Sequence, residues 1–100
     1  MLNINNYKSK IKEICDKLHI KKLALFGSAT TDEFGPKSDI DIIVEFDRQK
    51  NKNLFNTYFI LKEELEKLFQ RPVDIVVKNS IKNPYLKQTI NSTRKTVYAK

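Results

Sequence analysis

Residues 23–46 read LALFGSATTDEFGPKSDIDIIVEF, and the other predicted elements are placed relative to them. They contain an apolar strand, a Gly-Ser turn, a polar loop and a second strand that carries two aspartates one residue apart. Because side chains alternate between the two faces of a strand, Asp39 and Asp41 are expected to point the same way. The apolar residues of the second strand are expected to point the other way, into a core: Ile40, Ile42, Val44 and Phe46.

The two aspartates indicate a cation site next to a phosphate site. Carboxylates side by side on an open strand face repel each other unless a cation lies between them. Gly27 and Ser28, just upstream, form a turn of the kind that cradles phosphate groups. The same dipeptide commonly ends a strand and caps a helix, so its spacing from the aspartates carries the argument. Together these residues favour phosphoryl or nucleotidyl transfer.

A third aspartate interrupts the stretch PVDIVV, residues 72–77. Aspartate is disfavoured within strands, yet Asp39, Asp41 and Asp74 all break β-branched runs. If the two strands are neighbours, Asp74 stands beside the first pair and completes a hard-oxygen site suited to Mg²⁺. The alternative interpretation is that all three are solvent-facing strand residues, with Ser38-Asp39 forming an ordinary turn.

The remaining periodicities predict an α+β fold, a small mixed β-sheet with helices packed on it. One apolar stripe predicts a helix over residues 3–18. A second stripe, which includes Phe55 and Phe59, predicts a helix that starts after the N-cap Asn53 and is stopped by Pro72. The other predicted elements are a central strand over residues 21–26, strands over 40–46 and 72–77, a helix over 84–90 and an edge strand over 96–99.

Length and charge narrow the class of protein. One hundred residues predict a single domain over residues 1–100. The formal net charge of +7 favours an anionic partner such as ATP, nucleic acid or an acidic protein, although scattered lysines equally fit a merely soluble surface. No apolar run approaches the roughly 20 residues that cross a bilayer, so no membrane partner is expected. Cys15 is the only cysteine, which excludes an internal disulfide and fits a cytoplasmic location.

Gly27-Ser28, ten intervening residues and then Asp39-Ile40-Asp41 match the G-S-x10-D-x-D signature of the DNA polymerase β-like nucleotidyltransferase superfamily. The chain resembles its minimal (MNT) branch, the MntA-type antitoxins encoded beside HEPN-domain toxins, over roughly residues 18–90. The resemblance implies a nucleotidyltransferase fold in which Gly27 and Ser28 hold the nucleotide phosphates. It also implies that Asp39 and Asp41 bind two Mg²⁺ ions, and that Asp74 binds the catalytic metal and helps to deprotonate the attacking hydroxyl.

The turn departs from the family pattern. Many members carry G-S-R-A-R-G, whereas this chain continues with residues 29–32, Ala-Thr-Thr-Asp, and lacks both arginines. Lys37, Arg71 and Lys78 are the candidates to compensate for them.

The function implied by the resemblance is an antitoxin that uses ATP and Mg²⁺ to transfer AMP to a tyrosine of a cognate HEPN RNase. Two alternatives stay open: a non-catalytic antitoxin that neutralises by binding, and nucleotidyl transfer to a small molecule or to RNA. A nucleic-acid partner fits the charge but is not favoured, because no aromatic and basic platform for single strands is evident. Tyr85 and Tyr98 are instead expected in the core or at an interface.

Overall fold

The computed structural model describes residues 2–31, 34–35, 38–78 and 82–100. Its elements follow one another as a 3-10 turn η1 (Ile4–Asn6), helix α1 (Lys8–Lys17), strand β1 (Ile20–Phe26), 3-10 turn η2 (Gly27–Thr30), strand β2 (Ile40–Phe46), helix α2 (Leu54–Phe69), strand β3 (Val73–Val77), helix α3 (Pro84–Thr93) and strand β4 (Lys95–Ala99). The predicted α+β class is therefore confirmed. No helix in these described stretches is long and apolar enough to cross a bilayer.

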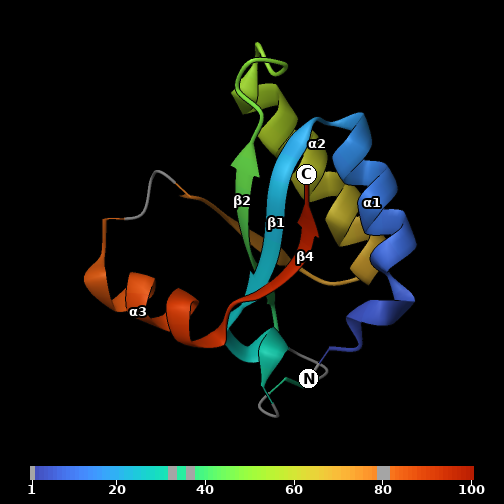
Figure 1. Cartoon of the computed structure of the whole chain (residues 1–100). Coiled ribbons are helices and arrows are strands. Elements are labelled where there is room, and N and C mark those ends of the chain that lie inside the picture. Colours follow the sequence, from blue (N-terminus) through green and yellow to red (C-terminus); the bar gives the residue numbers. More distant parts are fainter. Residues whose placement is uncertain (1, 32–33, 36–37, 79–81) are drawn as a thin grey trace.

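The four strands form one mixed sheet in the order β3-β2-β1-β4 (Figure 1). Strand β1 runs antiparallel to both of its neighbours, β2 and β4, so the prediction of a central first strand and an edge strand near the C-terminus is confirmed. Strands β2 and β3 are parallel and are joined by α2, which forms the crossover that a parallel pair requires. Because of this crossover, β2 and β3 both begin at the same end of the sheet.

Helices cover both faces of the sheet, α1 and α2 on one face and α3 on the other (Figure 1). The larger core lies between the sheet and the first two helices, where Leu23 and Leu25 of β1 pack with Leu61 and Leu65 of α2. A smaller cluster lies under α3, whose Ile90 packs on alternate strand residues, Ala24, Phe26 and Ile43. Strand β1 is thus buried on both faces, as its continuous apolar run predicted.

Side-chain caps define where the two longer connections enter helices. The Asn53 side chain accepts a hydrogen bond from the Asn56 amide at 3.0 Å, and Asn83 accepts one from the Tyr85 amide at 2.9 Å. At its other end α2 stops at Phe69, before the predicted stop at Pro72, because Gln70 adopts the left-handed conformation with φ of 55°. The first predicted helix is also interrupted, since a 3-10 turn and Tyr7 precede α1.

Two aromatic residues of the apolar stripe on α2 lie outside the core. Phe55 and Phe59 are 76% and 52% exposed. Tyr85 is 79% exposed, which excludes the core and leaves the interface, the other place expected for it. With 3.6 residues per turn, Phe55 and Phe59 lie about 120° and 160° around α2 from the buried Leu61. Apolar residues occur around more than half of this helix, so its buried face could not be read from composition alone.

Candidate active site

Asp41 of β2 and Asp74 of β3 are direct partners in the parallel register of the two strands. Asp39 lies one residue before β2, at the same edge of the sheet. The expectation that these two strands are neighbours is therefore confirmed. The parallel pairing places three carboxylates close together, at the amino ends of β2 and β3.

The carboxylates face away from the larger core. Ile40 and Ile42 are fully buried against α1 and α2, and the alternation of side chains turns Asp41 to the face that α3 partly covers. Asp41 is half-buried there, whereas Asp39 and Asp74 are exposed. The cluster is consequently open to solvent and to molecules that approach from outside.

Burial and like charge both disfavour the ionised form of Asp41. Burial raises the pKa of its carboxyl group above the ordinary value, and the nearby charges of Asp74 and Asp39 raise that pKa further. A bound cation would relieve this repulsion. The electrostatics of the site therefore agree with the donor chemistry in favouring a cation.

The Gly-Ser turn lies directly against Asp41. Gly27 has a left-handed backbone with φ of 69°, and a Cβ atom built on it would lie 2.7 Å from Oδ2 of Asp41. Only glycine accommodates both the backbone conformation and this close approach. Ser28 follows within η2, half-buried, so the structure brings the turn and the carboxylates together as the spacing predicted.

Thr93, at the last position of α3, also contacts this turn. The Gly27 amide N–H donates a hydrogen bond to the Thr93 hydroxyl oxygen at 2.8 Å, and that hydroxyl donates to the Thr89 carbonyl at 2.6 Å. Helix α3 thereby holds the backbone of the Gly-Ser turn in place. The two partners are 66 residues apart, and nothing in the local sequence distinguishes Thr93 from an ordinary helix residue, so sequence reasoning missed it.

Arg71 anchors the segment that leads into Asp39. Its Nη1 donates to the carbonyl oxygens of Gly35 and Ser38, each at 3.0 Å. The guanidinium also lies over the Phe34 ring, 4.4 Å from its centroid. Arg71, two residues before β3, thus holds the segment that precedes β2 and Asp39.

Lys78, another candidate cation, does not lie at this site. It pairs with Glu45 at 3.5 Å, at the opposite end of β2. Lys37 lies outside the described residues.

The donor set fits Mg²⁺ that arrives with a nucleotide rather than a preformed metal cage. Within the described ranges, no three histidine, cysteine or acidic side chains converge closely enough to hold a metal ion by themselves. Mg²⁺ usually takes one or two carboxylates and fills its remaining positions with water and substrate phosphates. Asp41 and Asp74, as register partners beside Gly27, offer that kind of partial coordination.

The sequence matches known proteins along most of its length. The model of the family described as "Nucleotidyltransferase domain" matches residues 8–97. A relative from Methanocaldococcus jannaschii, provisionally named a protein adenylyltransferase, is 46% identical over 90 residues, which cover 82% of this chain and 89% of the relative. The protein adenylyltransferase MntA of Thermococcus cleftensis is 32% identical over 87 residues, 87% of this chain and 82% of that protein.

Solved structures share the fold. A protein described as a minimal nucleotidyltransferase superposes with a TM-score of 0.73 at 24% identity, covering 95% of both chains. A toxin-antitoxin structure with AMP-PNP gives a TM-score of 0.70 at 22% identity, covering 93% of this chain and 73% of the other. The complex of a tri-AMPylated Shewanella oneidensis HEPN toxin with an MNT antitoxin gives 0.65 at 20% identity, covering 96% and 72%.

Proposed function

The chain belongs to the nucleotidyltransferase domain family and is a nucleotidyltransferase, and we propose that it transfers AMP from ATP to a tyrosine hydroxyl of a cognate HEPN-domain toxin. In this role it is an antitoxin that silences its toxin by modification. The observation that carries the proposal is the register pair Asp41 and Asp74 beside the Gly27 turn. The names of its relatives and the complexes that share its fold support the choice of donor and acceptor.

Each residue of the site has a role in the proposed reaction. Gly27 and Ser28 would hold the phosphates of ATP, and Asp39, Asp41 and Asp74 would hold two Mg²⁺ ions. Bound Mg²⁺ supplies neutralisation of the phosphate charge and lowers the pKa of the attacking hydroxyl. Asp74 orients that hydroxyl and assists loss of its proton. The hydroxyl oxygen then forms a bond to the α-phosphorus, the bond to the bridging oxygen of the β-phosphate breaks, and pyrophosphate leaves.

In this proposal, the acceptor hydroxyl reaches the site from solvent, where the exposed Asp39 and Asp74 lie. We propose that residues 1–100 act as one minimal nucleotidyltransferase domain and that the toxin itself presents the acceptor group. The exposure of Asp39 and Asp74 supports this arrangement, because a protein side chain can approach them without a conformational change. We also place the activity in the cytoplasm, where ATP is available and a single thiol stays reduced.

The experiment that tests this proposal follows the phosphate that is transferred. The purified chain is incubated with its toxin, Mg²⁺ and ATP radiolabelled at either the α- or the γ-phosphate. AMP transfer predicts that the toxin acquires label from the α-position and none from the γ-position. Label from the γ-position would make the chain a kinase, and no label from either position would remove the enzymatic proposal.

A second candidate is an antitoxin that neutralises by binding alone. The turn at Ala29–Thr31, which lacks the two arginines of many relatives, favours this alternative, while the gathered aspartates oppose it. Replacing Asp39 and Asp41 together with alanine separates the two candidates in cells that express the toxin. A binder still protects the cells after this change, whereas a transferase loses protection.

A further inference from the structure

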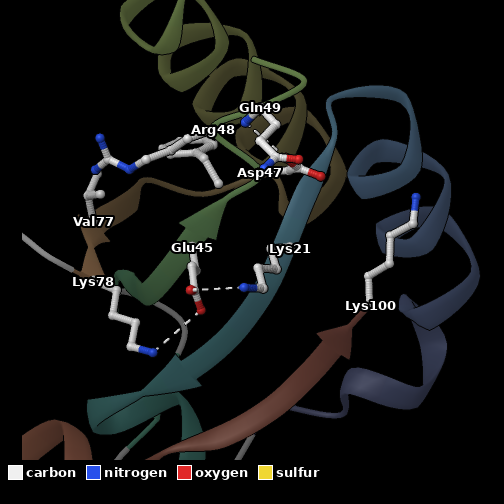
Figure 2. Close-up of a pocket in the computed structure, with 9 residues that line it drawn as sticks. Lys21, Glu45, Asp47, Arg48, Gln49, Val77, Lys78 and Lys100 are labelled. Carbon is white, nitrogen blue, oxygen red and sulfur yellow. Dashed lines mark hydrogen bonds and ion pairs between the residues drawn. The ribbon is translucent and has the colours of Figure 1, made fainter. Parts of the chain in front are cut away.

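A cavity, shown in Figure 2, lies beyond the carboxyl ends of β2 and β3, whereas the aspartates lie at the amino ends of these strands. It has a volume of about 450 Å³ and opens where β2 and β3 end and β1 begins. Its wall residues Glu45 and Asp47 are four and six positions beyond Asp41. At about 3.3 Å per strand residue, the cavity lies roughly 13–20 Å from the candidate active site. It is therefore a separate feature of the molecule.

Basic side chains dominate the wall of this cavity. Lys21, Arg48, Lys78 and Lys100 line it, against two acidic residues. Glu45 lies between two of the lysines, with Oε1 at 3.8 Å from the Lys21 ammonium and Oε2 at 3.5 Å from that of Lys78 (Figure 2). Each ammonium group has three N–H donors, so this pairing holds both in place and leaves donors for a ligand.

The second acidic residue of the wall, Asp47, uses its carboxylate to stabilise the turn that it begins. One carboxylate oxygen of Asp47 accepts hydrogen bonds from the backbone amides of Gln49 and Lys50, at 3.1 and 3.3 Å. Among the residues that the structure describes, the guanidinium of Arg48 and the ammonium of Lys100 have no ion-pair partner. The charge left for a ligand is therefore positive.

The position of the cavity in the fold also favours an anion. In open sheets, ligands commonly bind beyond the carboxyl ends of parallel strands, and here β2 and β3 end at the cavity. Phe46 and Val77 add apolar surface to the wall, beside the charged groups. A volume of several hundred cubic ångströms is in the range of small-molecule sites.

We propose that this cavity binds a phosphate-bearing ligand, either a nucleoside phosphate or the phosphodiester of an RNA. The planar fork of Arg48 matches two phosphate oxygens, and Lys21 and Lys78 add fixed positive charges. The half-buried Val77 offers apolar surface beside the charges, on which the base of a nucleotide can pack. The proposal does not depend on AMP transfer, because the cavity shares no residue with the aspartate cluster.

The test maps binding on the whole chain by the NMR shifts of its backbone amides. AMP and, separately, a short single-stranded RNA are added in EDTA, so that metal-dependent binding at the aspartates is absent. Binding in the cavity predicts shifts at Arg48, Gln49 and Lys78 but not at Gly27. Replacing Arg48 and Lys78 together with alanine should weaken binding about tenfold or more, because two charge-assisted contacts are lost.

Two controls make the result specific. Replacing Lys8 and Lys12 of α1 with alanine removes the same charge from exposed positions that do not line the cavity, and should leave binding within about twofold. Asp41→Asn should also leave binding unchanged. Shifts with AMP alone identify a free nucleotide as the ligand, and tighter binding of the RNA identifies a phosphodiester. The proposal is wrong if neither probe shifts the cavity amides, or if both double variants bind equally well.

Discussion

Gly27 illustrates how one residue serves both backbone geometry and chemistry. Its positive φ strains any side chain, and a Cβ atom built on it would lie only 2.7 Å from Asp41 Oδ2, so there is no room for one. The same closeness brings the turn that would hold phosphates next to the carboxylates that would hold the metal. Asp41, in turn, keeps a raised pKa because it is partly buried beside two other acids. The ionised carboxylates are thus electrostatically unfavourable until a cation binds between them.

Gly27→Ala should destabilise the protein by about 1–3 kcal/mol, because the left-handed backbone and the contact with Asp41 both become strained. Gly35→Ala is the matched control, since an added Cβ there meets only the Ser38 hydroxyl at 4.0 Å. Urea unfolding of both variants measures the difference in the free energy of unfolding. Equal stabilities would show that the close approach at Gly27 is not rigid.

Thr93→Val should lower kcat/KM for ATP about five- to tenfold, the effect expected from one lost hydrogen bond that orders the Gly27 amide. We expect the change mainly in KM, because Thr93 positions the turn and does not touch the reacting atoms. Thr93→Ser keeps the hydroxyl and should restore activity. If the serine and valine variants behave alike, the hydrogen bond has no role in nucleotide binding.

At the scale of the elements, the crossover helix α2 determines which carboxylates meet. It returns the chain so that β3 pairs in parallel with β2, and its side chains also contact β3 directly. Glu66 accepts a hydrogen bond from the Val73 amide at 3.0 Å, and the Tyr58 hydroxyl donates to the Ile75 carbonyl at 3.4 Å. These contacts fix the position of Asp74 on an edge strand that has a single strand neighbour.

Substitutions of Arg71 test whether activity depends on its charge or on the contacts that its guanidinium makes with the segment before β2. Arg71→Lys keeps the positive charge, but its shorter side chain lacks the planar guanidinium that stacks on Phe34 while Nη1 reaches both carbonyls. We expect Arg71→Lys and Arg71→Ala to lose a similar share of kcat/KM, about tenfold, because both release the segment before Asp39. Steady-state rates measure this loss. Full activity of the lysine variant would show that Arg71 acts on phosphate through its charge.

The elements themselves could largely be predicted from the sequence, because local rules determine them. The bounds of β2, the N-cap Asn53 and the alternation around Asp41 follow from side-chain periodicity and capping chemistry. The register of Asp41 with Asp74 needed the additional assumption that their strands are neighbours. The contact of Thr93 with Gly27 and the exposure of Phe55 depend on tertiary packing, which leaves no local pattern.

On the scale of the whole molecule, the helical layer over the larger core buries the only thiol. Cys15 is fully buried, and burial together with the nearby charge of Asp16 raises the pKa of its thiol to about 12. Cys15 therefore packs in the larger core, on the apolar face of α1. Tyr98 of the edge strand donates a hydrogen bond to Asp16 at 2.5 Å, which raises the pKa of its phenol to about 12 as well.

Stability should therefore fall at alkaline pH. The unfolded thiol ionises near its ordinary pKa of 9.0, whereas the folded thiol keeps its proton until about 12, so the unfolded state binds fewer protons in this window. The free energy of unfolding should drop by up to about 1 kcal/mol between about pH 9 and pH 10, as urea titrations can measure. Cys15→Ala should be less stable overall but show a flatter pH dependence. An equally steep dependence in that variant would exclude Cys15 as the cause.

The most direct test of the central claim is the intact mass of the HEPN toxin after incubation with this chain, ATP and Mg²⁺. We predict a gain of one or more adenylyl units, with the modified peptide carrying the group on a tyrosine. Asp41→Asn is the control, because it removes one of three crowded charges and should fold at least as stably while transferring no AMP. An unmodified toxin with the unaltered chain, or equal modification with Asp41→Asn, would contradict the assignment of this site.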